Sequence, residues 1–366
     1  MELMGSLKRQ IRNVAVFKAY TWGTFLKQIF LFPYDYYIRD GTSSPPMNIA
    51  LFLTLRCNAR CDMCNLIQLL DKDKDSEPTL ENIQKFIKSV AHSNPSIILF
   101  GGEPFVRSDI FDVLSVVKNH GLNCGIFTNG LLLNEDKIKE LIRLELDYIA
   151  FSLLGIGEGH NKIVGIKNAY EKLINNIRMF CEMDRKTRVI IHTTITEDNL
   201  QHLMDIVELG KTLKVDQVRF GHPTFFTDSD VEKSNAFCKI NFPNEDIKEF
   251  SYSYNPTGKE EKFYGVIKGL KEKYNGSICF SPELGDSEIK TWYSNKFITK
   301  RKCFFAWRGC FVYPNGDVVP CESISYKMGN IYRQSFEDIW NGEKYKDFRR
   351  KLKNGLFPAC VRCCKL

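Results

Sequence analysis

The stretch IALFLTLRCNARCDMC, residues 49–64, decides the fold of this chain of 366 residues. Its first half, Ile49–Leu55, is an apolar run of the length that is typical of a buried strand. Three cysteines, Cys57, Cys61 and Cys64, follow within eight residues. The pattern therefore predicts a buried strand whose carboxyl end carries a cysteine-rich loop.

The same order of a buried strand, a loop and a helix repeats along the chain as far as residue 222. Strands are expected at 49–55, 97–100, 124–128, 148–152, 188–194 and 217–220, and helices at 80–91, 109–120, 135–144, 170–182 and 199–213. Six strand–helix units in succession predict an α/β fold with a parallel sheet and helices outside it. Six units rather than eight indicate a partial (β/α)6, TIM-like barrel. In such folds the loops after the strands carry the chemistry.

The rhythm of the sequence divides the chain into four expected segments. They are an aromatic and basic helical extension (1–46), the partial barrel (47–222), a polar linker or insertion with one helix near 261–274 (223–300), and a small cysteine-rich α+β domain (301–366). The last segment contains Asn315-Gly316 between apolar residues, which predicts the tip of a β-hairpin. Helices are expected after it at 336–340 and 345–352.

The composition limits the classes of protein to which the chain can belong. It has 13 cysteines, an odd number, and no secretory signal, which together indicate a reducing, cytoplasmic location rather than a disulfide framework. The formal charge of +7 is too mild to indicate nucleic-acid binding. No run of 18 uncharged apolar residues is present, so no membrane-spanning helix is expected.

The N-terminal region 17–37 is unusually rich in aromatic residues, and Phe25, Ile29 and Phe32 recur at helical spacing. One interpretation is a helix with peripheral membrane contact, or a lid over a lipid-like substrate. The other is a helix packed on the main domain, which we favour because such a stripe more often faces a core.

The thiols after the first strand indicate a metal centre. Three thiolates leave one position of a metal open, and soft sulfur ligands favour zinc or iron–sulfur chemistry. A structural zinc site would need a fourth ligand, but the nearest further candidates are His92 and Cys124. A catalytic centre is therefore favoured over a structural one.

The spacing C-x3-C-x2-C of this loop resembles that of the radical S-adenosylmethionine (SAM) superfamily. The resemblance implies that the three cysteines hold a catalytic [4Fe–4S] cluster that chelates SAM, with Met63 beside it. The run Gly101-Gly102-Glu103-Pro104 is similar to the family's motif for the amino group of SAM. The remaining positions that the resemblance places near SAM are Thr128, Asn129, Ser152 and Arg219.

Some of these positions allow a second interpretation. Leu154 stands where family members often have an aspartate, so only Ser152 is retained from that strand end. Arg219, His192 and His222 either point into the barrel, toward SAM or substrate, or are hydrogen-bonded core or surface residues.

The cysteines of the last segment resemble the SPASM or twitch extension of radical SAM enzymes. The resemblance implies an auxiliary [4Fe–4S] cluster in addition to the catalytic one. Only one auxiliary cluster is implied, because few residues follow the last C-x2-C pair. Cys310 and Cys364 compete with the assigned residues, and a zinc ribbon is the alternative. The assigned ligands are Cys303, Cys321, Cys360 and Cys363.

The resemblance implies reductive cleavage of SAM to a 5′-deoxyadenosyl radical, which abstracts a hydrogen atom from the substrate. A one-electron donor of the flavodoxin or ferredoxin type is the implied partner. We expect a small-molecule substrate, such as a sugar, an alcohol or a lipid-like compound. The alternatives are a peptide maturase that crosslinks a ribosomally made precursor, and a non-catalytic iron–sulfur or zinc-binding protein. Only 48 residues precede Ile49, which weighs against a leader-binding domain and so against the maturase.

Overall fold

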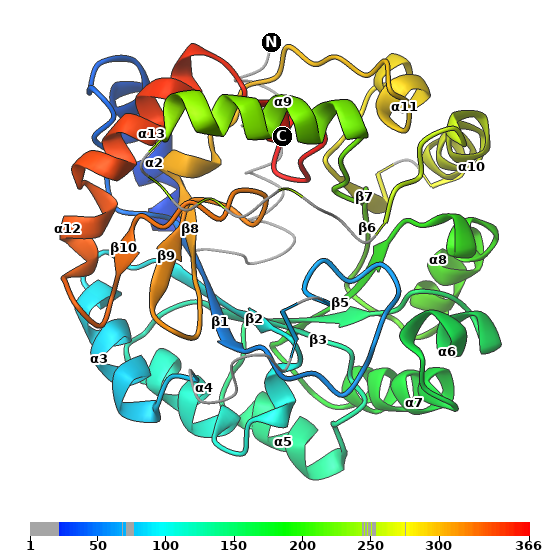
Figure 1. The fold of residues 1–366 in the computed structure, drawn as a ribbon. Coiled ribbons are helices and arrows are strands. Elements are labelled where there is room, and N and C mark those ends of the chain that lie inside the picture. Colours follow the sequence, from blue (N-terminus) through cyan, green and yellow to red (C-terminus); the bar gives the residue numbers. More distant parts are fainter. Residues whose placement is uncertain are drawn as a thin grey trace.

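The computed structural model describes residues 22–67, 69–70, 77–243, 245, 247, 250, 254–274 and 276–366. One ten-stranded sheet runs through these residues in the order β10-β9-β8-β1-β2-β3-β4-β5-β6-β7. The sheet curves, and helices α3 to α8 follow its outer side (Figure 1). In the described part of the chain its edges are not paired with each other, so the barrel is partial and open.

The six strands expected from the sequence are confirmed as neighbouring parallel strands. They are β1 (Asn48–Thr54), β2 (Ser96–Gly101), β3 (Cys124–Thr128), β4 (Tyr148–Ser152), β5 (Arg188–Thr194) and β6 (Gln217–Gly221). The intervening helices are α3 (Leu80–Ala91), α4 (Ile110–Asn119), α5 (Glu135–Arg143), α6 (Glu158–Val164), α7 (Ala169–Glu182), the 3₁₀ turn η3 (Glu197–His202) and α8 (Leu203–Thr212).

Helix α3 illustrates why these segments are helical. Its N-cap, Thr79, accepts a hydrogen bond from the backbone N–H of Asn82, which satisfies a donor that has no partner within the helix. Apolar residues at helical spacing face the sheet and are buried: Ile83, Phe86, Ile87 and Val90.

The segment 223–300 contains more regular structure than the sequence predicted. The expected helix is confirmed as α10 (Glu260–Lys273), but α9 (Asp228–Asn241) and α11 (Asp286–Trp292) accompany it. A seventh parallel strand, β7 (Ile278–Ser281), pairs with β6. It was missed because its apolar run is only four residues long and lies between polar stretches. The α/β class and the partial barrel are confirmed, and β7 adds a parallel strand beyond the six expected ones.

The C-terminal segment joins the same sheet. The predicted hairpin is confirmed as β8 (Gly309–Val312) and β9 (Asp317–Val319), with β10 (Gly329–Asn330) beyond it, and β8 lies parallel to β1. Two helices follow, α12 (Phe336–Trp340) and α13 (Glu343–Asn354). The hairpin therefore lies directly beside the strand that leads into the first cysteine loop. The boundaries of the four segments stay a prediction.

The N-terminal helix α2 (Trp22–Tyr37) packs through one face on the rest of the chain. The ring of Phe32 lies 5.1 Å from that of Phe304, and the ring of Tyr36 lies 4.9 Å from that of Trp307. On the other face Phe30 is 76% exposed. Phe17 and Tyr20 lie outside the described residues. The packed helix is confirmed for this part, and membrane contact stays a prediction.

Among the helices that the structure describes, none combines the length and apolar character needed to cross a membrane.

Candidate active site

The first cysteine loop leaves β1 at its carboxyl end and is held by backbone hydrogen bonds. The N–H of Cys64 donates to the carbonyl of Cys61 at 3.0 Å, which turns the loop back on itself. The N–H of Arg60 donates to the carbonyl of Val164 at the end of α6, at 3.3 Å. All three thiols, those of Cys57, Cys61 and Cys64, are half-buried. The loop is therefore fixed by contacts on both sides of its cysteines.

The three thiols lie within electrostatic reach of one another. Burial, and then the neighbouring Cys64 and Cys57, raise the pKa of Cys61 to about 12. Burial also raises the pKa of Cys57, with a further contribution from Cys64. Thiols with such pKa values lose their protons when they bind a metal, because the thiolate is the ligand. Three soft donors on one loop fit a cluster with one open iron.

The two glycines at the end of β2 are required by the close approach of the cysteine loop. Gly101 has φ +132°, and a Cβ there would lie 2.3 Å from the carbonyl oxygen of Thr54. A Cβ on Gly102 would lie 2.1 Å from the carbonyl oxygen of Arg56. The N–H of Gly102 donates to Thr54 and that of Glu103 to Arg56, each at 2.9 Å. Whether these residues also contact SAM stays a prediction.

Glu103 is buried and connects the ends of β2 and β3. Its carboxylate accepts from the hydroxyl of Thr128 and the N–H of Asn129 at 2.8 Å each, and from the N–H of Phe105 at 3.1 Å. Burial raises its pKa to about 7, against the effect of these hydrogen bonds. The side chain of Asn129 donates to that of Asn58 at 2.8 Å. Through Asn129, the motif that begins with Gly101 is thus linked to the residue after Cys57.

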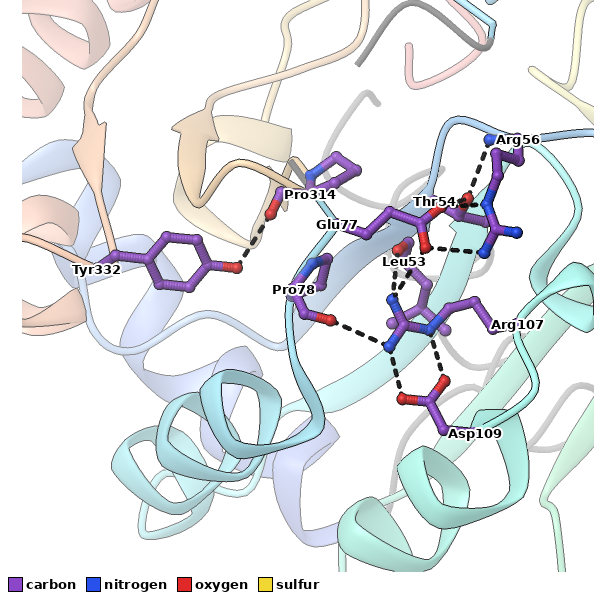
Figure 2. Close-up of polar contacts among 9 residues, drawn as sticks. All are labelled: Leu53, Thr54, Arg56, Glu77, Pro78, Arg107, Asp109, Pro314 and Tyr332. Atoms are coloured by element: carbon purple, nitrogen blue, oxygen red, sulfur yellow. Dashed lines mark hydrogen bonds and ion pairs between the residues drawn. The ribbon is translucent and has the colours of Figure 1, made fainter. Parts of the chain in front are cut away.

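A network of charged side chains, which the sequence gave no reason to expect, fixes the carboxyl end of β1 (Figure 2). Glu77 accepts two hydrogen bonds from Arg56, at 2.7 and 2.9 Å, and one from Thr54. Although burial raises the pKa of Glu77, these bonds outweigh it and the net direction is down. The buried Arg107 donates to the carbonyl of Leu53 at 3.2 Å and pairs with Asp109.

Pro104 begins the short 3₁₀ turn η2 (Pro104–Val106), which places Arg107 in this network. The network therefore connects the ends of β1 and β2 to the first residues of the cysteine loop. No sequence signal pointed to Glu77 or Arg107, since neither belongs to a motif. Met63 packs against the main core rather than standing free in solvent.

The inner face of the sheet carries a layer of aromatic rings below the strand ends. Phe52 stacks on Tyr313 with the ring centroids 4.7 Å apart, and it meets Phe100 edge to face at 5.0 Å. Phe100 contacts Phe127 at 5.6 Å, and Phe127 contacts His192 at 5.6 Å. These rings form an apolar floor beneath the polar residues at the ends of the strands.

Ser152, His192 and Arg219 lie in one row across β4, β5 and β6, each paired with the next. Paired residues of adjacent strands face the same side of a sheet. The structure thus brings the predicted Ser152 and Arg219 together with His192 on the inner face. Burial, followed by the positive charges of Arg219 and Lys365, lowers the pKa of His192 to about 3.

His222, the other histidine that the sequence singled out, belongs to the core. Its Nδ1 lies 2.6 Å from the hydroxyl of Tyr293, and its ring stacks on Phe280 at 5.8 Å. Burial lowers its pKa to about 3. The interpretation of a hydrogen-bonded core residue therefore holds for His222.

The C-terminal thiols form a second group near the end of the chain. The thiol of Cys363 interacts electrostatically with those of Cys321 and Cys303, and so does that of Cys360. Burial, followed by Cys303, raises the pKa of Cys321 to about 12. These are the four residues that the sequence assigned to the auxiliary cluster, and their role as its ligands stays a prediction.

The two competing cysteines lie differently. Cys310 is fully buried within β8, where it pairs with Ile49 of β1, and its electrostatic partner is Arg349. Cys364 contacts Cys363 and interacts with Thr224 and Lys365. The position of Cys310 speaks against it as a ligand, whereas Cys364 stays an alternative.

Within the described parts of the chain, no three cysteine, histidine or carboxylate side chains already surround a point where a single metal ion could bind. The thiolates of a [4Fe–4S] cluster each bind a different iron, so they need not converge on one point. Two groups of soft thiols, one of three and one of four, fit a pair of such clusters.

A small hollow lies beside the second group of thiols. It is bounded by the segment after β6 and by the two cysteine-bearing loops of the C-terminal segment. Its lining residues are Thr224, Cys321, Glu322, Ser323, Cys363, Cys364 and Lys365.

Comparison with known families gives two matches that cover separate parts of the chain. Residues 51–210 match the family model for the radical SAM superfamily. Residues 303–364 match the model for the SPASM iron–sulfur cluster-binding domain. The first match contains the loop with Cys57, Cys61 and Cys64, and the second contains all six C-terminal cysteines.

Three relatives illustrate the range of known activities. The tungsten-containing aldehyde ferredoxin oxidoreductase cofactor-modifying protein of Pyrococcus furiosus is 26% identical, over 86% of this chain and 86% of its own. The AdoMet-dependent heme synthase of Methanosarcina barkeri is 28% identical, over 84% and 86%. The PqqA peptide cyclase of Bradyrhizobium diazoefficiens is 21% identical, over 87% and 79%.

Among solved structures, SuiB of Streptococcus suis bound to its precursor peptide SuiA has the same fold. The TM-score is 0.61 at 14% sequence identity, and the match covers 90% of this chain and 70% of SuiB.

These findings answer the question of class that the sequence raised. The non-catalytic alternative is not supported, since the chain matches an enzyme superfamily and relatives named as enzymes. The cofactors are a SAM-binding [4Fe–4S] cluster, SAM itself and an auxiliary iron–sulfur cluster. The chain belongs to the radical SAM superfamily and carries a C-terminal SPASM iron–sulfur domain.

Proposed function

We propose that this protein is a radical SAM enzyme that modifies a peptide, with Cys57, Cys61 and Cys64 holding the catalytic cluster. Once bound and reduced by one electron, that cluster would supply the electron for reductive cleavage of SAM, which would yield methionine and a 5′-deoxyadenosyl radical able to take a hydrogen atom from the substrate. The comparisons favour a peptide over the small-molecule substrate that the sequence placed first, because peptide cyclases and a peptide-bound structure are among the relatives.

The chain's own residues position this chemistry. The Glu103 network and the Glu77–Arg56 pair hold the cysteine loop against the ends of β1 and β2. The aromatic floor formed by Phe52, Phe100 and Phe127 removes water from below the reacting groups. These residues orient the cysteine loop and shield the reacting groups from water, whereas the cofactors supply the redox chemistry.

The identity of the relatives is the observation that carries the peptide proposal. Two PqqA peptide cyclases match 87% and 81% of this chain, so the likeness is not confined to the radical SAM domain.

A second candidate is modification of a cofactor or a tetrapyrrole precursor. It is favoured by the two relatives at 26% and 28% identity, whose names describe a cofactor-modifying protein and a heme synthase. Both candidates use the same cluster loop and differ in the substrate alone.

The test is a substrate screen with the anaerobically reconstituted enzyme, SAM and a reductant. Short peptides encoded beside the gene, and iron-containing and iron-free porphyrins, are offered separately, and products are read by mass spectrometry. The proposal predicts that one peptide loses the mass of two hydrogen atoms, or gains another defined change, in step with 5′-deoxyadenosine release. Turnover of a porphyrin with unchanged peptides would establish the second candidate instead.

A further inference from the structure

The inner face of the sheet contains a polar atom without a partner. Nδ1 of His192 is buried and accepts or donates no hydrogen bond within the described residues. The imidazole stays neutral, and its ring is fixed edge to face on Phe127. A buried nitrogen without a partner is unfavourable unless a ligand or water supplies one.

A glycine of β6 lies beside the ring of His192. Gly221 follows Arg219 by two residues on β6 and faces the same side of the sheet. A Cβ on Gly221 would lie 3.2 Å from the His192 ring, so any larger residue would crowd the imidazole. The absence of a side chain at Gly221 therefore leaves the imidazole uncrowded from β6.

Two cations approach this position from different parts of the chain. Arg219 is paired with His192 in the sheet, and its guanidinium also interacts electrostatically with Lys365 and Cys364. Lys365 lines the hollow and lies 3.8 Å from the carboxylate of Glu322. The side chains of Lys365 and Glu322 are each about one-third exposed (32% and 34%), so their pairing is open to solvent and weak.

We propose that His192, Arg219 and Lys365 form a subsite that receives a carboxylate of the substrate, beside the auxiliary cysteines. The inference rests on the proposed function and deepens it, because it identifies the bound group as an acidic side chain of the peptide. A carboxylate can accept the N–H of the neutral imidazole together with hydrogen bonds from both cations.

The unpartnered nitrogen and the two cations beside it favour an anion over a cation at this place. Arg219 and Lys365 bring two positive charges, against one negative charge from Glu322. The anionic auxiliary cluster offsets this excess, but it does not supply a partner for Nδ1 of His192. A carboxylate supplies that partner and accepts hydrogen bonds from both cations.

The experiment measures binding of two matched probes to the reconstituted holoenzyme with SAM. The probes are N-acetylglutamic acid α-amide and N-acetylglutamine α-amide, which differ in the side-chain carboxylate alone. Binding is followed by NMR line broadening of the probe as it exchanges between its free and bound states. The proposal predicts that the acid binds at least tenfold more tightly than the amide.

Variants assign the preference to residues. R219Q and K365M should each remove most of the tenfold preference, and H192F should reduce it while keeping a ring against Phe127. The matched control R178Q changes an exposed arginine on the outside of α7 and should keep the preference. K365M changes a partly exposed residue near the end of the chain, so the test stands even where R219Q fails to fold.

Equal binding of both probes to the wild-type enzyme would overturn the subsite, and so would an acid preference that survives in both R219Q and K365M. Either result would assign the two cations to neutralising the auxiliary thiolates. A clear acid preference without modification of any peptide would refute the proposed function alone. A modified peptide without an acid preference would refute the subsite alone.

Discussion

Replacing Gly102 by alanine tests whether the close approach of β2 to the cysteine loop positions the catalytic cluster. The new Cβ would lie 2.1 Å from the carbonyl oxygen of Arg56 and 2.7 Å from its carbonyl carbon, whereas real Cβ contacts essentially never fall below 3.0 Å. Both atoms belong to the backbone, so no side-chain rotation relieves the overlap. The start of the loop must therefore move by almost 1 Å.

The cost can be worked from the bonds that this movement breaks. The hydrogen bonds from Gly102 to Thr54 and from Glu103 to Arg56 contribute about 1 kcal/mol each. Overpacking of a rigid contact adds about 1–3 kcal/mol. The total of about 3–5 kcal/mol is comparable to a large part of the stability of an average domain, about 5–15 kcal/mol. We expect the chain to fold with a displaced loop.

The assay compares iron content and SAM cleavage in anaerobically reconstituted proteins. The wild type should hold about eight irons and G102A about four, because only the auxiliary cluster remains. The control is G265A in α10, where no atom lies within 4 Å of the new Cβ, and it should gain up to about 1 kcal/mol in stability. A G102A protein with a full iron content and wild-type SAM cleavage would refute the reasoning.

Three further changes test other parts of the structure. Alanine at Cys57, Cys61 and Cys64 together should leave about four irons and no SAM cleavage, and iron near zero would contradict the separate C-terminal cluster. R107M should lower the free energy of unfolding, measured by urea titration, by about 2–4 kcal/mol, because Asp109 loses its buried partner. An unchanged free energy of unfolding would show that the network in Figure 2 does not contribute to stability. The folded-state pKa of His222, about 3, lies below the ordinary value of 6.5. Its contribution to the free energy of unfolding is therefore fully present above pH 6.5 and is lost as the pH falls toward 3, at up to about 1.4 kcal/mol per pH unit. H222F should lose less stability than the wild type between pH 7 and 5.5, and an equal loss would contradict the assignment.

Much of the fold was predictable because its strands are regular in sequence. The apolar runs of β1 to β6 and the cysteine spacing each carry a local signal, and the structure confirms the strands. The strand β7 carries no such signal, because four apolar residues between polar stretches are too few to stand out. The pairing of β8 with β1 joins positions some 260 residues apart, which no local pattern reveals.

The parts of the site that belong to a sequence motif were predictable. The parts that only tertiary contacts bring together were not. The sequence identified Gly102 as part of a motif, but it could not show why a glycine is needed there. The carbonyl of Arg56 approaches this position only in the folded chain. Glu77 and Arg107 belong to no motif, and only the structure brings them to the end of β1. His192 and His222 looked equivalent in sequence, and the hydroxyl of Tyr293 distinguishes them.

The central claim is that the loop with Cys57, Cys61 and Cys64 performs radical SAM chemistry. The most direct test is 5′-deoxyadenosine release from the anaerobically reconstituted, reduced protein, measured by mass spectrometry beside C57A. The account predicts release by the wild type and none by C57A. An iron-loaded, reduced wild-type protein that releases no 5′-deoxyadenosine, or a C57A variant that releases it at the wild-type rate, would contradict the account.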